Sequence, residues 1–307
     1  MLDDDASTPQ QSSGPLVSVI VPVYNNNDGL RTCLAALEDQ TYPADRYEVI
    51  AVDNGSDPPA ASAAAPFPHA RVVTESRPGS YPARNRGLGV ALGDVIAFTD
   101  SDCVPANTWI ARGVAALLGT PHCGLVGGHI EVVYATASRP TAIERFSAMT
   151  ARQQQLFLRI DHFAETANLF TFKSVLEQVG RFDPELKARG DVVFGKRVFA
   201  AGYRQVYAED ARVRHPAIRT LRQLRRRTAR LVGGKWDAAK SPSAASFSET
   251  DTASTDTRHV LRLVRRLLRD AEFAPRERCA VLGVLGFVQV VVCCERVRLL
   301  LGGVSRR

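Results

Sequence analysis

Apolar runs alternate with helical patterns along the first hundred residues. The expected strands cover 16–22, 47–53, 70–74 and 93–99, and the expected helices between them cover 28–39 and 80–92. The first two strands are near-continuous apolar runs rich in β-branched residues, which is typical of strands buried on both faces of a sheet. Strands that alternate with helices indicate βαβ units. We therefore expect an α/β fold with a mostly parallel central sheet flanked by helices.

The pattern stays mixed in the second part of the chain. The expected helices there cover 107–118, 139–160 and 191–201, and the expected strands lie near 124–133 and 203–208. Residues 212–240 carry ten Lys or Arg, one acid and leucines at helical spacing. Residues 258–269 have the pattern of a basic amphipathic helix, and 279–294 form a run of sixteen residues in which Gln289 interrupts apolar side chains and cysteines.

These changes of composition predict a division of the chain. Residues 1–14 are polar and are expected to be disordered, 15–240 form a globular domain, and 241–257 are a linker rich in Ser, Thr and Ala. Residues 258–307 form a basic and apolar helical tail. With 307 residues, the chain is long enough for such a domain to bury a large core.

Charge is distributed unevenly. The net charge is +7, but residues 1–211 have a net charge of −6 and residues 212–307 a net charge of +13. A basic tail predicts an anionic partner, such as a membrane surface, a phosphate-bearing substrate or nucleic acid. The 45% hydrophobic and 23% charged residues argue against a disordered chain or a polytopic membrane protein. The polar start lacks a secretory pattern and the six cysteines form no CxxC pair, so a cytosolic protein with reduced thiols is expected.

Carboxylates follow two of the expected strands. Asp100 and Asp102 come directly after 93–99, where two carboxylates can hold a divalent cation that also contacts the phosphates of a nucleotide, although a solvated polar turn has the same pattern. Asp53 ends another strand and can accept a base N–H or close a turn. Arg84 and Arg86 lie near a helix start, which is a natural site for diphosphate. The first turn lacks the G-x-G-x-x-G of a dinucleotide site.

Four segments together resemble the family 2 glycosyltransferases in content, order and spacing. They are residues 19–25, 52–57, 83–88 and 98–102. The resemblance runs from about Leu16 to about Gly234, and it implies a GT-A fold, a nucleotide-activated sugar as donor and inversion at the anomeric carbon. It also implies that 15–106 form the nucleotide-sugar half of the domain and 107–240 the acceptor half.

The resemblance implies roles for particular residues of the first half. The residues expected to bind the nucleotide-sugar are Pro22, Tyr24, Asn25, Asp53, Asn54, Arg84, Arg86, Asp100 and Ser101. Asp102 is expected to be the main ligand of a divalent metal, Mn²⁺ or Mg²⁺, with Asp100 and His215 completing its ligands. A lone histidine is also often structural.

The second half resembles the family more loosely. Asp191 is expected to be the general base, because an acceptor hydroxyl must lose a proton as it attacks the sugar. Relatives often have Glu-Asp here, whereas this sequence has Gly190, so any role of the missing glutamate is absent or supplied elsewhere. On the acceptor side we also expect Asn168, Arg197 and Trp236, the last of which could equally lie on the domain surface.

The tail leaves several alternatives open. Sixteen apolar residues fall short of the roughly 20 that cross a bilayer, so 279–294 is a spanning helix, a buried helical hairpin or an interfacial helix. The basic segments 219–230 and 258–269 are expected to meet an anionic membrane surface or a lipid-linked acceptor diphosphate. Nucleic acid is not expected, because no aromatic residues are interleaved with these charges.

The expected function is inverting, metal-assisted transfer of a sugar, with a UDP-sugar favoured as donor, to a hydroxyl of a glycan or glycolipid. The expected place is the cytoplasm, peripherally at the inner face of the cell membrane. Two alternatives remain: a nucleotidyltransferase, or an inactive membrane-associated scaffold of the same fold.

Overall fold

The computed structural model describes residues 14–150, 153–238, 257–269 and 273–306. The expected disordered segment 1–14 and the expected linker 241–257 lie outside these residues, except for Gly14 and Thr257.

Within the described residues, one sheet of eight strands has the order β3-β2-β1-β4-β7-β6-β8-β5. The strands are β1 (Val17–Val23), β2 (Tyr47–Asp53), β3 (Ala70–Thr74), β4 (Val95–Thr99), β5 (Val104–Pro105), β6 (Cys123–Val133), β7 (Asn168–Phe172) and β8 (Arg204–Pro216). Strands β3, β2, β1 and β4 are parallel, whereas β7 is antiparallel to both β4 and β6. Strand β8 is parallel to β6, and the two-residue β5 is antiparallel to β8.

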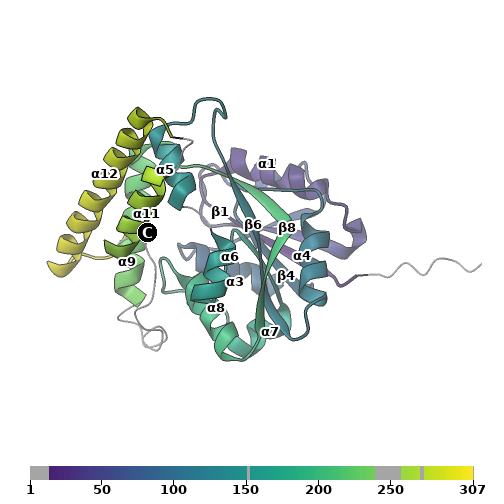
Figure 1. Cartoon of the computed structure of the whole chain (residues 1–307). Helices are drawn as coiled ribbons and strands as arrows, with labels where there is room; N and C mark the ends of the chain where they lie inside the picture. The colour runs from purple at the N-terminus through teal and green to yellow at the C-terminus, as the bar shows by residue number, and fades with distance from the viewer. Residues whose placement is uncertain (1–13, 151–152, 239–256, 270–272, 307) are drawn as a thin grey trace, which may run out of the picture.

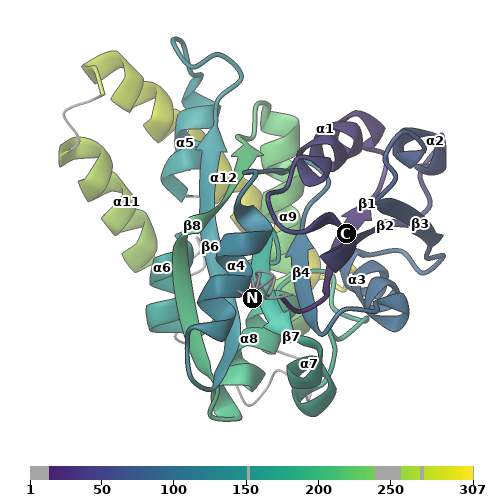
Figure 2. The ribbon, with the colours of Figure 1, turned by 90° about the vertical axis from the view of Figure 1, so that its right-hand side faces the viewer.

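Both faces of this sheet are covered, because its strands alternate apolar side chains between two core clusters. Val19 of β1 belongs to one cluster, together with residues of α1 (Asn27–Glu38), α2 (Ala61–Ala64) and α4 (Trp109–Leu118). Ile20 belongs to the other, with residues of α3 (Ser80–Val90), α7 (Lys173–Val179) and α8 (Gly190–Ala200). Figure 2 shows α1 and α2 on one side of β1–β3 and α3 on the other. The result is the α/β sandwich that the sequence predicts.

A third apolar cluster lies beside the sheet. It is formed by α5 (Ala142–Thr150), α9 (Leu221–Ala238), α11 (Thr257–Arg269) and α12 (Pro275–Leu300), which gather at the left of Figure 1. Among the described helices, α12 is long and apolar enough to cross a membrane; its most apolar 18-residue window has a mean hydropathy of 1.9 and is 33% buried. Because α12 is one continuous helix, residues 279–294 do not form a hairpin.

The residues after α12 return to the domain. Ser305 is buried, and its hydroxyl donates a hydrogen bond of 2.5 Å to Asp237 Oδ2 on α9. Lys187 Nζ donates to both the carbonyl and the hydroxyl oxygen of Ser305, at 2.8 and 2.7 Å. The tail is therefore tied to the segment that precedes α8.

Several element boundaries differ from the sequence-based expectation. The expected helix 139–160 is interrupted: α5 ends at Thr150, and α6 (Gln154–Leu156) continues into a π-helical turn at Phe157–Asp161. The expected strand 203–208 continues to Pro216, because Ala211 and Val213 alternate into the core between exposed arginines. Helix α7 was not expected from the periodicity.

Candidate active site

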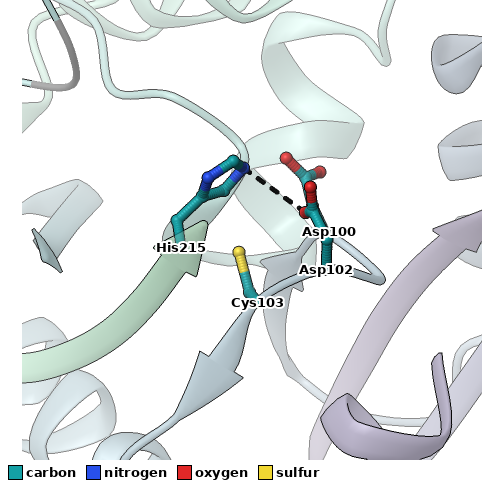
Figure 3. A group of neighbouring side chains, drawn as sticks. All are labelled: Asp100, Asp102, Cys103 and His215. Carbon is teal, nitrogen blue, oxygen red and sulfur yellow. Dashed lines mark ion pairs between the residues drawn. The ribbon is translucent and has the colours of Figure 1, made fainter. Parts of the chain in front are cut away.

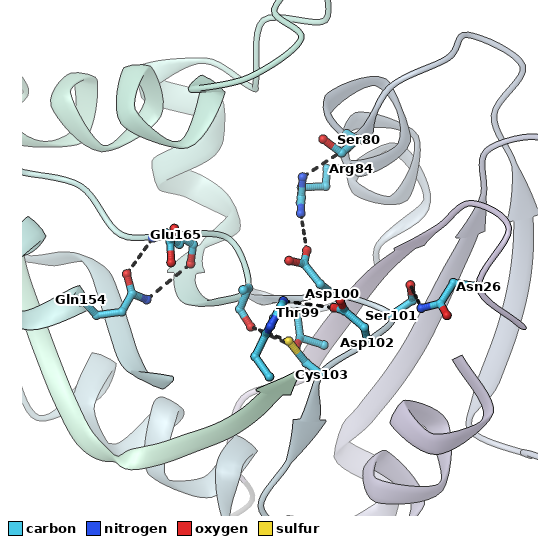
Figure 4. Close-up of polar contacts among 12 residues, drawn as sticks. Asn26, Ser80, Arg84, Thr99, Asp100, Ser101, Asp102, Cys103, Gln154 and Glu165 are labelled. Atoms are coloured by element: carbon cyan, nitrogen blue, oxygen red, sulfur yellow. Dashed lines mark hydrogen bonds and ion pairs between the residues drawn. The ribbon is translucent and has the colours of Figure 1, made fainter. Parts of the chain in front are cut away.

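The candidate site lies where β1 and β4 are neighbours in the sheet. The chain leaves β1 toward β2 and β3 and returns to the other side of β1 as β4, so this is the topological switch point of the parallel strands. Ligands of open α/β sheets bind outside the carboxyl ends of strands at such a point. The two strand ends are joined directly, because Asn26 Nδ2 donates to Ser101 Oγ at 3.2 Å (Figure 4).

Four potential metal ligands converge beyond the end of β4. One ligand atom from each of Asp100, Asp102, Cys103 and His215 lies within 4.8 Å of the others. Figure 3 shows the side chains pointing into one space, with His215 coming from the end of β8. The sequence predicted Asp100, Asp102 and His215 here, but not Cys103.

The histidine is set up to contact a cation. Its Nδ1 lies 2.8 Å from the carbonyl oxygen of Pro216, which can only accept, so Nδ1 carries a proton. Its Nε2 lies 3.3 Å from Asp102 Oδ1. In the neutral imidazole, Nε2 has a lone pair that would face a carboxylate oxygen, and either a second proton or a shared cation relieves that repulsion. Carboxylates and a neutral imidazole oriented by a carbonyl fit a divalent metal ion.

Arg84 forms the opposite wall of this cluster. Helix α3 places its guanidinium so that Nη2 donates to Asp100 Oδ1 at 2.7 Å, although Arg84 is only 4% exposed. Its Nε is buried without a hydrogen-bond partner among the described residues. A buried guanidinium with an unused donor beside this group of potential metal ligands fits a site for phosphate oxygens. Arg86 is exposed and, two residues further along the helix, points away from Arg84, so the structure does not bring it to the cluster.

The loops after β1 and β2 support one another. Asp53 is 4% exposed and accepts hydrogen bonds from the backbone N–H of Ser56 (2.9 Å) and Ala60 (2.8 Å). Burial raises the pKa of Asp53, but these bonds and one from Gly55 outweigh it, so the pKa is lowered. Asn25, whose φ is 50°, accepts from Asp57 N at 2.8 Å and donates its own N–H to Ser56 Oγ. Asp53 therefore holds the loop that would face a base.

Three further predicted residues lie at this edge. Asn54 donates to the carbonyls of Glu75 and Arg77 and accepts from Gly79 N, which connects the loops after β2 and β3. Pro22 is half-buried in β1, and Tyr24 just beyond it is 65% exposed. The exposed ring of Tyr24 is open to a ligand.

Asp191 lies in the first turn of α8. Burial, and next the negative charge of Glu165, raise the pKa of its carboxyl; the N–H of Val192 and the charges of Arg84 and Arg189 act in the opposite direction. Arg84 is thus within electrostatic reach of both Asp191 and Asp100. A carboxylate that is less acidic than usual suits the work of a base.

Position 190 has room only for glycine. A Cβ at this position would lie 2.7 Å from Cζ of Tyr81, whose buried ring covers the start of α8. Burial, and next the charge of Asp191, raise the pKa of Tyr81. The glutamate that relatives often carry here would collide with this ring, whereas Glu165 brings a carboxylate to Asp191 from another segment.

One acceptor-side expectation needs correction, and a second stays a prediction. Asn168 is 0% exposed, accepts from Trp109 Nε1 and donates to the carbonyls of His129 and Ala211, each at 2.8 Å, so it joins strands and cannot meet an acceptor. Arg197 lies two turns beyond Asp191 on α8 and donates to the carbonyl of Arg181 at 2.6 Å. It holds the turn before α8, and its role on the acceptor side stays a prediction.

Trp236 is half-buried and packs against the third apolar cluster. The residues that the sequence did not single out are Asn26, Tyr81, Cys103 and Glu165. Cys103 directly follows Asp102 and Asn26 follows Asn25, so their position beside the motifs was a usable signal, whereas nothing in the pattern marked Glu165.

Comparisons with known proteins show the family of the chain. Residues 18–180 match the model of glycosyl transferase family 2. The chain is 40% identical over 211 residues to the glycosyltransferase AglE of Haloferax volcanii, covering 67% of this chain and 68% of AglE. It is 29% identical over 228 residues to a pre-mycofactocin glycosyltransferase of Mycobacterium tuberculosis, covering 70% of this chain and 46% of that protein.

Solved structures share the fold at low sequence identity. A mannosyltransferase from Pyrobaculum calidifontis, in complex with GDP-Man and Mn²⁺, is 20% identical with a TM-score of 0.61 over 93% of this chain and 88% of its own. TarS residues 1–349 of S. aureus are 16% identical with a TM-score of 0.51 over 95% and 93%. The fold is therefore that of the GT-A glycosyltransferases. The chain belongs to glycosyltransferase family 2.

Proposed function

We propose that the protein transfers a sugar, with inversion, from a nucleotide-diphosphate-sugar to a hydroxyl group of a glycan or lipid-linked acceptor. The observation that carries the proposal is the convergence of Asp100, Asp102 and His215 beside the buried guanidinium of Arg84, at the switch point of the sheet. The nucleotide-sugar half is residues 15–106 and the acceptor half is 107–240, followed by the linker 241–257 and the tail 258–307.

Each group at the donor side has a task. Asp102, Asp100 and His215 would hold a divalent ion, Mn²⁺ or Mg²⁺, which when bound neutralises charge on the departing nucleoside diphosphate. Arg84 adds a fixed positive charge with an unused N–H. The loops that Asp53 and Asn54 hold in place, together with Pro22, Tyr24 and Asn25, form the base and ribose pocket. Ser101, tied to Asn26, fixes the turn that carries both aspartates.

Asp191 is the proposed general base. It accepts the proton of the acceptor hydroxyl as that oxygen attacks the anomeric carbon from the face opposite the nucleotide. Arg84, which acts on both Asp100 and Asp191, places the base within electrostatic reach of the donor site. Gly190 and Tyr81 set the position of Asp191 by fixing the first turn of α8.

The alternatives make different demands on the same residues. A nucleotidyltransferase would release diphosphate from a nucleoside triphosphate and needs no acceptor base such as Asp191. An inactive scaffold has no use for Asp100, Asp102 and Asp191 together with a buried Arg84, whereas Asp53 would hold its loop in either case. The arrangement therefore favours sugar transfer.

Thermal unfolding tests the donor site. The melting temperature is measured with UDP, with GDP and without nucleotide, each with and without Mn²⁺. Ligand at 100 times its Kd stabilises by about 2.7 kcal/mol, and about 2 °C per kcal/mol is expected for a chain of this size. A metal-dependent shift with UDP supports the UDP-sugar donor, and a shift with GDP alone makes the donor a GDP-sugar. No shift in either case rejects the enzyme and favours the scaffold.

We further propose a peripheral place on the inner face of the cell membrane. One face of α12 packs on the domain through Val281, Val288 and Val292, while Val290, Val297 and Leu300 are exposed on the other. Helix α9, which carries most of the exposed arginines of 219–230, packs against α12, and segment 258–269 adds further basic residues. An apolar stripe next to arginines fits an anionic bilayer. Sedimentation with anionic and with zwitterionic vesicles tests this location. A protein that sediments with neither kind of vesicle contradicts it.

A further inference from the structure

One cysteine stands among the proposed metal ligands. Cys103 is 0% exposed, and its Sγ belongs to the group of ligand atoms that lie within 4.8 Å of one another. Figure 3 shows the sulfur pointing into the space between the two aspartates and His215. The carboxylates and the imidazole already belong to the proposed site, and the sulfur is an additional donor of a different kind.

For one ion to bind all four groups, they must lie slightly closer together than they do here. Zinc–sulfur bonds are about 2.3 Å and bonds to nitrogen or oxygen about 2.0–2.2 Å, so two ligands of one ion lie at most about 4.5 Å apart. The observed spread of 4.8 Å exceeds this limit by a few tenths of an ångström. Ordinary side-chain adjustment closes such a gap.

The hydrogen bond from the Cys103 thiol to the carbonyl of Ala167 is weak. Cys103 Sγ donates to the carbonyl of Ala167 at 3.8 Å, which is a long contact and a weak use of a poor donor. The same carbonyl also accepts from Thr99 Oγ1 at 3.0 Å. It therefore stays hydrogen-bonded when the sulfur turns to a metal ion.

We propose that Cys103 is a thiolate ligand of this centre, so that the centre, which would accept Mn²⁺ or Mg²⁺, binds a borderline ion such as Zn²⁺ or Co²⁺ more tightly than either. On binding, the S–H bond breaks, a bond between sulfur and the metal forms, and the proton passes to solvent. Nothing is oxidised or reduced. The inference rests on the proposed function, because it concerns the same metal centre.

The selectivity follows from donor chemistry. Oxygen ligands and water suit Mg²⁺, whereas thiolate and imidazole suit zinc and cobalt, and affinity rises from Mn²⁺ to Co²⁺ in sites of this kind. With Asp100 and Asp102 alone, the centre would be an oxygen site. Adding Cys103 and His215 gives two oxygen, one nitrogen and one sulfur donor, which is a set suited to a tetrahedral ion.

Cobalt binding gives a direct readout. The full chain is first changed to serine at the exposed Cys279, Cys293 and Cys294, so that these thiols cannot bind the ion. Co²⁺ is then added and the absorbance is followed in the near ultraviolet, where thiolate-to-cobalt charge transfer appears. Cys103→Ala is the test variant, and Cys123→Ala, which removes a buried thiol at the start of β6, is the matched control.

We expect a charge-transfer band that Cys103→Ala removes and Cys123→Ala keeps. We also expect the Zn²⁺ affinity to fall at least about tenfold in Cys103→Ala, since even outer partners of metal ligands are worth 10–100-fold. The affinity for Mg²⁺ should change less than about threefold, because that ion does not use sulfur.

Failure of the sulfur ligand and failure of the whole metal centre give different results. Bound Co²⁺ with visible bands but no charge-transfer band in the parent chain shows that sulfur is not a ligand, which overturns the inference and leaves the metal centre standing. This reading does not depend on whether Cys103→Ala folds. If Co²⁺, Mn²⁺ and Mg²⁺ all fail to bind with or without nucleotide, the proposed metal centre fails, and the inference with it.

Discussion

His215 Nε2 lies 3.3 Å from Asp102 Oδ1 and joins the end of β8 to the turn after β4. Asp102 belongs to the proposed nucleotide-sugar half, whereas His215 comes from the proposed acceptor half. The contact therefore closes the site across segments that are far apart in the sequence. The proposed metal ligands come together only when β8 is in place.

Asp102→Asn should abolish the metal-dependent part of nucleotide binding. The amide keeps the size of the carboxylate but loses the negative charge that a divalent ion requires. The stabilisation by Mn²⁺ with UDP or GDP, about 2.7 kcal/mol at 100 times the Kd, should disappear in thermal unfolding. Asp94→Asn, at the exposed opposite end of β4, is the control and should bind as the parent does. Undiminished binding by Asp102→Asn would remove this residue from the metal ligands.

Asp191→Asn should stop transfer while leaving the donor in place. Loss of a general base costs about 10²–10⁴-fold in rate. We expect kcat to fall by at least about 100-fold and the Kd of the nucleotide to stay unchanged, as measured by sugar transfer and by calorimetry. A variant that keeps more than a few per cent of the transfer rate would show that another group takes the proton.

Glu165→Gln should move the acid limb of the pH profile. Asp191 can accept a proton only when it is ionised, and the negative charge of Glu165, after burial, raises its pKa. Without that charge the pKa of Asp191 falls, so transfer persists to lower pH in profiles of kcat/KM. Glu177→Gln, an exposed change on α7, should leave the limb in place. A limb that stays fixed or moves to higher pH in Glu165→Gln contradicts the coupling.

Gly190→Ala should destabilise the fold around the base. Its Cβ would lie 2.7 Å from Cζ of Tyr81, and overpacking of this kind costs about 1–3 kcal/mol. Gly283→Ala on α12 meets nothing within 4 Å and should be neutral or slightly stabilising. Urea unfolding of both variants measures the difference. Equal stability of the two would mean that the Tyr81 ring can move aside at no cost.

The local pattern of apolar and polar residues was enough to predict two strands in the first half of the domain. Strands 47–53 and 70–74 have the bounds that the sequence predicts. The first is a buried parallel strand with apolar residues on both faces, and the second is a half-buried edge strand; both end in polar turns. The convergence of Asp100 and Asp102 at a strand end follows from the same rule.

The sequence pattern was not sufficient to predict the role of a residue where that role depends on tertiary contacts. Asn168 matched a family segment, but its amide is used inside the sheet by Trp109, His129 and Ala211. Glu165 carries no sequence signal, since its effect on Asp191 depends on how the segment before β7 folds. Helical periodicity over 139–160 did not reveal the π-helical turn that interrupts it.

The junction of Ser305 with Lys187 and Asp237 has a practical consequence for anyone who handles this protein. Lys187 lies four residues before Asp191, so the hydrogen bonds of Ser305 hold the end of the described chain close to the proposed base in sequence. An affinity tag or fluorescent fusion joined shortly after Ser305 would lie next to these contacts. A tag placed ahead of β1 involves none of the three residues and is the better choice for purification and for kinetics.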